Sequence, residues 1–281
     1  MNFELVLTRN QLGFVGNEMF SDENLEELVR YVRDGPLEIE KLDFTACPGF
    51  NPAPLRDILS LSIVTLDISG TFDVKFVVDC LVDPRCTLRE LFLTGLAWTL
   101  NEQVQFCHAL QDPNCHLHTL ILREPRIDRG EFSVFCQMIV RRGHLSSLSI
   151  QKANMDDERL SYLCWAFSEN KTITHLDLQY NTFHSVFYLS SLLLERNDTL
   201  CEINLQNNDV PYAIESFVPI VANNHCIENI SLSNEGPAIL QLCAYFHRNK
   251  LRKRMIKARI MSLYKDVEST SALYHYLKKK L

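Results

Sequence analysis

The chain has 281 residues, of which 46% are hydrophobic, and a formal net charge of −7. It holds no apolar run near the roughly 18 residues of a membrane-spanning helix, and MNFELVLTRN has no basic segment leading into a long apolar stretch. These features argue against a membrane span and a signal peptide, and they predict a soluble cytoplasmic protein. Residues 1–247 hold 17 Lys and Arg against 33 Asp and Glu, whereas residues 248–281 hold 11 against 2, so an acidic body precedes a basic tail.

A short pattern recurs along the chain, in which the first, fourth and sixth letters are apolar. FELVLTRN places Leu5 at the middle apolar letter, 37 residues before Leu42. The later middle letters are Leu42, Leu66, Leu91, Leu120, Leu148, Leu176, Ile203 and Ile230, at intervals of 24 to 29 residues. Such near-constant spacing predicts a stacked array in which each unit contacts its neighbours.

Each unit is expected to contain a strand followed by a helix. Alternate apolar letters of a strand, such as Leu176 and Leu178, point into the core, and the letters between them point to the other side. The clearest helix is expected over residues 156–173, where three acidic residues precede a helical stripe. The prolines of residues 47–54 leave room for only a short helix. The two stripes used for these predictions are Leu160, Leu163, Cys164 and Phe167, and then Val186, Leu189, Leu193 and Leu194.

Asparagine and cysteine recur at fixed distances after the strands. Asn10, Asn181 and Asn208 stand three residues past the last apolar letter, where an amide side chain can bind backbone groups of a turn, and Cys47 takes the same place in another unit. Fourteen residues past that letter stand Cys107, Cys136 and Cys164. This equivalence predicts buried free thiols in a packed position, rather than disulfides or metal ligands.

The phrase LxxLxLxxN, its period of 27–29 residues and the intervening helical patterns resemble leucine-rich repeats of the ribonuclease-inhibitor type. ENKTITHLDLQYN (169–181) and RNDTLCEINLQNN (196–208) are similar to that family's passage from helix to strand. The resemblance implies an α/β fold, a curved solenoid with a parallel sheet on its concave side and helices on its convex side. We expect an N-terminal cap and irregular first repeat over 1–36, the repeats over 37–235, and a helical, basic C-terminal cap over 236–281.

The repeats are expected to end after Leu232, because KLRKRMIKARI carries charges where the next copy needs apolar residues. One helical stripe, which runs on past Lys250, and a second, final amphipathic helix would cover the open end of the core. The basic residues there are expected to solvate the cap, with contact to nucleic acid or an anionic membrane as the alternative. The stripes are Ile239, Leu242, Cys243 and Phe246, then Val267, Leu273, Tyr276 and Leu277; the basic residues are Arg252, Lys253, Arg254, Lys257 and Arg259.

The sequence shows no motif for catalysis or for phosphate binding. It contains no GxxxxGK[ST], GxGxxG, HExxH or GxSxG, and no pair of CxxC motifs. Its nine histidines are scattered, and the one short Cys and His cluster, residues 115–118, straddles the start of a repeat strand. We therefore predict a protein that is not an enzyme and uses no cofactor, metal or small-molecule substrate.

The residues at the variable positions of the pattern, on the concave side, form the candidate site. Phe92 and Ile121 are apolar residues on adjacent strands, where the pattern allows polar ones, and they predict an anchor for a protein partner. A second, polar group surrounds His175. The expected contact residues are Asp43, Asp67, Glu90, Phe92, Ile121, Arg123, His175, Asp177, Gln179, Tyr180, Glu202 and Asn204.

These features favour a non-enzymatic scaffold that binds a protein through its concave face. The acidic body favours a partner with a basic surface. Three alternatives stay open at this point. They are a regulator of a small GTPase, similar to the Ran GTPase activator, an actin-filament cap resembling tropomodulin, and a microbial effector that acts on a host protein.

Overall fold

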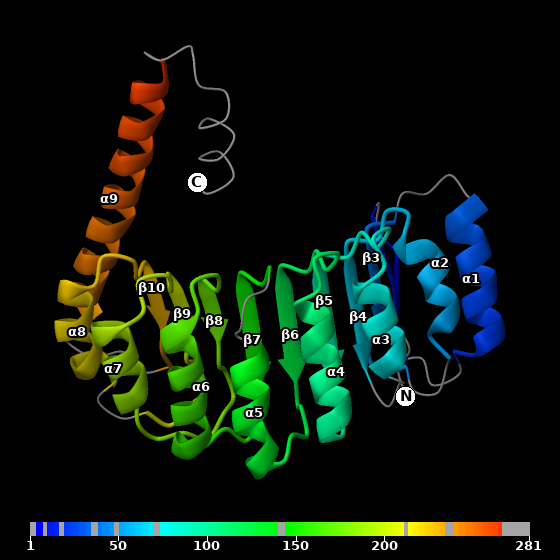
Figure 1. Ribbon diagram of the computed structural model, residues 1–281, viewed down its shortest axis with the longest axis horizontal. Helices are drawn as coiled ribbons and strands as arrows, with labels where there is room; N and C mark the ends of the chain where they lie inside the picture. Colours follow the sequence, from blue (N-terminus) through cyan, green and yellow to red (C-terminus); the bar gives the residue numbers. More distant parts are fainter. Residues whose placement is uncertain are drawn as a thin grey trace.

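The computed structural model describes residues 4–7, 10–16, 20–34, 39–47, 51–69, 74–139, 144–210, 213–233 and 239–265 (Figure 1). Strands and helices alternate through these ranges. The strands are β1 (Glu4–Leu7), β2 (Gln11–Val15), β3 (Lys41–Phe44), β4 (Thr65–Ser69), β5 (Glu90–Thr94), β6 (Thr119–Arg123), β7 (Ser147–Gln151), β8 (His175–Asp177), β9 (Glu202–Asn204) and β10 (Asn229–Ser231). The α-helices are α1 (Asp22–Asp34), α2 (Arg56–Leu59), α3 (Val74–Leu81), α4 (Leu100–Leu110), α5 (Arg129–Ile139), α6 (Asp157–Glu169), α7 (Phe187–Glu195), α8 (Ala213–Asn223) and α9 (Ile239–Lys265).

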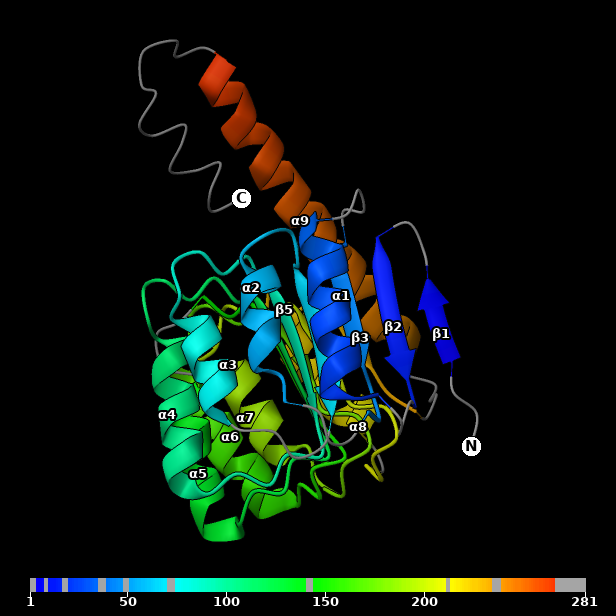
Figure 2. The same ribbon diagram turned by 90° about the vertical axis from the view of Figure 1, so that its right-hand side faces the viewer.

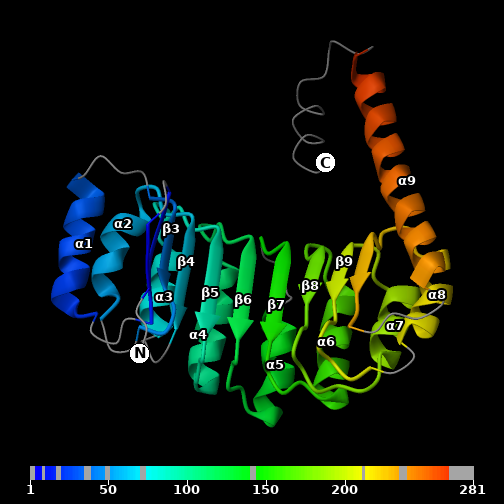
Figure 3. The same ribbon diagram turned by 180° about the vertical axis from the view of Figure 1, so that it is seen from behind.

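The described strands form one sheet in chain order, and every pair from β2 to β10 is parallel. The helices α1 to α8 lie along one face of this sheet and leave its other face without helices (Figures 2 and 3). A helix about 10 Å wide must stack beside each strand, although neighbouring strands are only about 4.8 Å apart. The helix side is therefore the longer side, and the array curves with its strands on the concave face, as the resemblance implied.

The first unit differs from the prediction made for it. β1 pairs with β2 in antiparallel fashion, so that Leu5 lies opposite Phe14. β2 is the strand that joins the parallel array, and it aligns Leu12 with Leu42. The assignment of Leu5 to the repeat position is therefore wrong. Both segments alternate apolar residues, so the pattern alone could not separate a repeat strand from an edge strand that covers it.

The asparagine prediction holds at two of its three positions. Asn181 Nδ2 donates to the carbonyl oxygens of Ile150 at 2.8 Å and Leu178 at 3.0 Å, while its Oδ1 accepts from Ala153 N at 2.9 Å. Asn208 repeats this role and accepts from Asn181 N at 2.9 Å, so the two amides join successive turns. Asn10 instead precedes β2, where its carbonyl accepts from Glu40 N, and its assignment to the turn position is wrong.

The recurring cysteines are buried free thiols, as predicted. Cys107, Cys136 and Cys164 lie in the core, and burial raises the pKa of the Cys107 thiol to about 12. Burial also raises the pKa of Cys136 and of Cys164, so all three stay protonated and unreactive. Cys47 donates its Sγ–H to the Phe14 carbonyl at 2.6 Å and so supplies part of what asparagine supplies elsewhere.

The predicted helices form where their stripes place them. The Asp156 side chain caps α6 by accepting from Arg159 N at 2.9 Å, and the stripe behind it is buried. At the end of the proline-containing stretch, the chain forms only a 3₁₀ turn (Ala53–Leu55), which includes Pro54, and the single turn of α2. In α7, Leu189 and Leu192 are buried, while the side chains of Leu193 and Leu194 lie outside the described residues.

The C-terminal helix α9 covers the end of the array with its first half only. Leu242 and Phe246 are buried against the last repeat, whereas Cys243 is exposed, contrary to the predicted stripe. Asn249 Nδ2 donates to the Ile227 carbonyl at 2.7 Å. Residues 251–257 are exposed, and the helix extends away from the repeats (Figures 1 and 3). The predicted stripe from Val267 to Leu277 lies outside the described residues.

No helix in the described ranges is long and apolar enough to cross a membrane.

Candidate functional site

The strand face that carries no helices presents side chains from successive repeats in straight rows. In the middle row, the sheet register aligns Asp43, Asp67, Phe92, Ile121, Ser149, Asp177 and Asn204. All twelve predicted contact residues lie on this face or at its rim. The register separates them into two groups, of which one lies over β3 to β6 and the other over β8, β9 and the turn after β8.

The first group surrounds Phe92. We call Lys41, Asp43, Asp67, Phe92 and Arg123 the N-terminal cluster. The Arg123 guanidinium carbon lies 5.4 Å from the centroid of the Phe92 ring, and Lys41 Nζ lies 5.8 Å from it. Phe92 is therefore half-buried beneath two cations rather than open to solvent, in a geometry that favours cation–π attraction. Lys41 was not among the predicted contact residues.

Asp67 is the most unusual residue of the N-terminal cluster. It is 4% exposed, and its Oδ1 has no hydrogen-bond partner. Its Oδ2 faces Arg123 Nη1 at 3.9 Å, which is too long for a hydrogen bond. Burial and the neighbouring Asp43 raise the pKa of Asp67 to about 6, although Arg123, the Thr45 hydroxyl and Lys41 act in the opposite direction. The Thr45 hydroxyl hydrogen-bonds to the carboxylate, but Oδ1 accepts no hydrogen bond, so this buried charge is only partly satisfied.

The other predicted residues of this region are better satisfied. Asp43 Oδ1 accepts from Thr45 N at 3.0 Å, and Lys41 Nζ lies 3.8 Å from its other oxygen. Glu90 accepts from the Thr65 hydroxyl at 3.1 Å across neighbouring strands. Ile121 is half-buried beside Phe92 on the next strand. The predicted apolar pair therefore exists, and charged residues border it on the side of β3 and β4.

The second group is a hydrogen-bonded polar network. We call Gln151, His175, Asp177, Gln179, Glu202 and Asn204 the C-terminal cluster. Asp177 Oδ1 accepts from Gln179 N at 3.0 Å, and Oδ2 accepts from Gln151 Nε2 at 2.7 Å and Gln179 Nε2 at 2.9 Å. His175 Nε2 lies 3.8 Å from Glu202 Oε1. Gln151 was not among the predicted contact residues, although it occupies the same position of its repeat as Gln179.

Several residues with positive φ line the rim at the end of the strands. Glu124, Lys152 and Tyr180 have φ of 52°, 50° and 57°, and each backbone N–H donates to a carbonyl of the next repeat. Lys152 Nζ contacts Glu124 Oε1 at 3.1 Å and lies 6.0 Å from the Tyr180 ring centroid. Tyr180 is 50% exposed, so this predicted residue stands open at the rim. Glu124 and Lys152 were missed because a turn conformation places them there.

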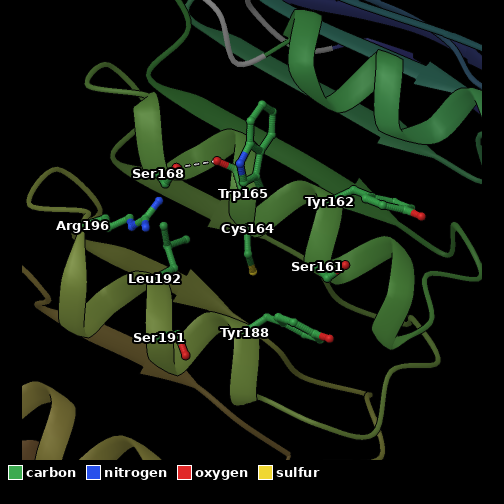
Figure 4. Close-up of a pocket in the computed structure, with 9 residues that line it drawn as sticks. All are labelled: Ser161, Tyr162, Cys164, Trp165, Ser168, Tyr188, Ser191, Leu192 and Arg196. Carbon is green, nitrogen blue, oxygen red and sulfur yellow. Dashed lines mark hydrogen bonds between the residues drawn. The ribbon is translucent and has the colours of Figure 1, made fainter.

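A groove of about 410 Å³ lies on the opposite, helical side, between α6 and α7. It is lined by Ser161, Tyr162, Cys164, Trp165, Ser168, Tyr188, Ser191, Leu192 and Arg196 (Figure 4). The rings of Tyr162 and Tyr188 extend in the same direction from the two helices, and Trp165 is 57% exposed. Two hydroxyl groups of the groove are satisfied within α6, since the Ser168 hydroxyl donates to the Trp165 carbonyl at 2.6 Å and Tyr162 donates to Glu158 at 2.8 Å.

No group of three or more His, Cys, Asp or Glu residues in the described part of the chain could hold a metal ion. The prediction of a protein without metal or catalysis stays a prediction.

The stacked units of one strand and one helix form a leucine-rich repeat fold, and the alignments show a similarity to repeat proteins of the ribonuclease-inhibitor type. The mouse ribonuclease inhibitor is 24% identical over 255 residues, which cover 85% of this chain and 54% of the inhibitor. The bovine NACHT, LRR and PYD domains-containing protein 5 is 24% identical over 217 residues, 72% of this chain and 20% of that protein. This chain thus spans about half the length of the first relative and a fifth of the second.

Among solved structures, the leucine-rich repeat-containing protein LegL7 from Legionella pneumophila superposes with a TM-score of 0.51 at 17% identity, over 85% of this chain and 91% of that one. This likeness supports the fold. No family model matches the chain.

Proposed function

We propose that this protein is a non-enzymatic interaction module that binds a protein partner through the concave face of its repeats. The observation that carries the proposal is the pair formed by Phe92 and Ile121, which lies on the strand face and is bordered by charged side chains. Apolar residues ringed by polar ones are typical of binding hot spots, because the ring excludes water from the centre. Curvature also presents several repeats to one partner at once.

The charge of the molecule supports a partner with a basic surface. The repeats lie within the acidic body, and the concave face carries Asp43, Asp67, Glu90, Asp177 and Glu202. The described cysteines are free thiols, which supports action in the reducing cytoplasm. Opposite charge speeds association and disfavours acidic competitors.

The test compares two double variants of the immobilised protein. In the first, Phe92→Ser and Ile121→Ser remove the apolar pair from the concave face. In the second, the matched control, Trp165→Ser and Tyr188→Ser remove two aromatic residues from the helical groove. We expect proteins that the wild type captures from a cell extract to be lost with the first variant and kept with the second. Capture that survives the first variant, with its circular dichroism unchanged, would contradict the proposal.

A further inference from the structure

We propose that the N-terminal cluster receives an arginine side chain of the protein partner, whose guanidinium donates to Asp67 and Asp43 beside Phe92. The inference rests on the proposed function, because it names the chemical group by which the concave face recognises its partner. It begins from a comparison of equivalent side chains in one row of the sheet.

Asp67 lacks a hydrogen bond that its counterparts make. Asp43, Asp177 and Asn204 stand at the same position of their repeats, and the Oδ1 of each accepts from the backbone N–H two residues later, at 3.0, 3.0 and 3.1 Å. No donor reaches Asp67 Oδ1, although this atom is buried. A buried carboxylate oxygen without a donor is destabilising. The repeat therefore retains an acceptor that a donor from another molecule can satisfy.

The cations of the N-terminal cluster do not satisfy these carboxylates. Arg123 Nη1 is 3.9 Å from Asp67 Oδ2, and Lys41 Nζ is 3.8 Å from Asp43 Oδ2. The side chains of Arg123 and Lys41 are 38% and 33% exposed, so each has room to move aside when a partner binds. Arg123 also indicates the geometry of the bound group, because its guanidinium already lies over the Phe92 ring and faces Asp67.

The arrangement suits arginine better than lysine or a metal ion. A guanidinium is planar, carries five N–H donors and stacks on aromatic rings, so one group can serve two carboxylates and Phe92 together. A lysine ammonium is a compact point charge that is more strongly hydrated. A calcium ion takes six to eight oxygen ligands, and this cluster offers two carboxylates with two cations beside them.

The experiment measures binding of a small arginine compound to the intact protein. Nα-acetyl-arginine amide is titrated into ¹³C-labelled protein, and the carboxyl carbon resonance of Asp67 is followed. Nα-acetyl-lysine amide and the neutral isostere Nα-acetyl-citrulline amide are titrated in parallel. The variant Asp67→Asn removes the carboxylate, and Asp177→Asn is the matched control at the equivalent position. Arg123→Gln removes the internal guanidinium that would compete with the ligand.

We expect a saturable shift with the arginine compound, at a Kd about three- to tenfold lower than the Kd of the lysine compound. The citrulline compound should show no saturation. Asp67→Asn should abolish binding of the arginine compound, which is then followed by the Asp43 resonance. Asp177→Asn should preserve this binding, and Arg123→Gln should strengthen it several-fold. Equal titration of all three compounds, no saturation, or unchanged binding to Asp67→Asn would overturn the inference.

Failure of this inference can be distinguished from failure of the proposed function. If the Phe92→Ser and Ile121→Ser variant loses its protein partner while Asp67→Asn keeps it with unchanged affinity, the concave face binds a partner without this arginine contact. If neither variant loses the partner, the proposed function itself is wrong.

Discussion

Asp67 and Asp177 occupy the same position in two repeats of one sheet, yet their surroundings differ sharply. Asp177 accepts three hydrogen bonds, from the backbone of Gln179 and from two glutamine side chains. Asp67 is buried more deeply, at 4% exposure, and its Oδ1 accepts none. Asp177 is thus a hydrogen-bonded member of the C-terminal cluster, whereas Asp67 is a partly unsatisfied charge in the N-terminal cluster. A buried polar group left unsatisfied in a native protein calls for an explanation, and a binding site is one such explanation.

The turns that follow the strands differ between the same two regions. In the C-terminal half, Asn181 and Asn208 bind backbone groups of adjacent repeats, whereas Cys47 holds this position near the N-terminus with a weaker thiol donor. The C-terminal repeats are therefore joined at this position by two buried amides, and the N-terminal repeats by one thiol.

The largest expected effect comes from removing one of these buried amides. Asn181→Ala removes buried bonds to Ile150, Leu178 and Ala153, and it should lower the free energy of unfolding by about 3–4 kcal/mol. Cys47→Ala, the equivalent change in the first third, should cost about 1–2 kcal/mol. Urea unfolding of both variants measures the two costs. Equal losses would mean that the turns of the two regions contribute alike.

The second effect is a pH dependence that belongs to Asp67. Its pKa is about 6 in the folded protein, above the ordinary value of 3.8, so folding favours the protonated form. The stability that protonation provides is complete below about pH 4 and is lost as pH rises through 6. Relative to Asp67→Asn, the wild type should therefore lose on the order of 2–3 kcal/mol between pH 4 and pH 7.

Urea unfolding of the wild type and of Asp67→Asn across this pH range measures the difference between them. The difference between the two proteins therefore reports the charge of Asp67 together with its coupling to the neighbouring Asp43. A difference that stays constant from pH 4 to pH 7 would show that Asp67 has an ordinary pKa.

A smaller effect is expected when the C-terminal cluster is made to resemble the N-terminal one. Gln151→Ala removes the donor that lies 2.7 Å from Asp177 Oδ2 and should cost about 1 kcal/mol. Gln206→Ala is the matched control, since Gln206 holds the same position two repeats later and is exposed there, and it should change stability by less than about 0.5 kcal/mol. Thermal unfolding compares them. If both variants behave alike, the network around Asp177 adds no stability.

The repeat phrase predicted much of this architecture because strand alternation and period are properties of the sequence itself. It aligned the strands from Leu42 to Ile230 correctly, as the register of β3 to β10 shows. It failed at Leu5 and Asn10, since an antiparallel edge strand and a parallel repeat strand alternate apolar residues in the same way. Direction of pairing depends on the turn between strands, which the pattern does not encode.

The candidate site was predicted only in its position on the fold. Alternation placed Phe92 and Ile121 side by side on the strand face, which the register bears out. It could not show that Lys41 and Arg123 reach over Phe92, because the direction of a long side chain depends on its neighbours on other strands. Nor could it separate Asp67 from Asp177, since the distinction lies in one backbone donor and two glutamine side chains that reach Asp177. Trp165 was missed because the exposed face of a helix follows no apolar rule.

The contrast between Asp67 and Asp177 is tested most directly by the free energy of unfolding of Asp67→Asn and Asp177→Asn at pH 7. If Asp67 is a partly unsatisfied charge kept for a partner, Asp67→Asn should stabilise the protein by about 1–3 kcal/mol, since it removes a buried charge whose Oδ1 accepts no hydrogen bond. Asp177→Asn should destabilise it by about 1–2 kcal/mol, because the new amide faces the glutamine donors. Opposite signs at one position of the repeat support this account. Destabilisation by both substitutions would contradict it, because Asp67 would then be as structural as Asp177.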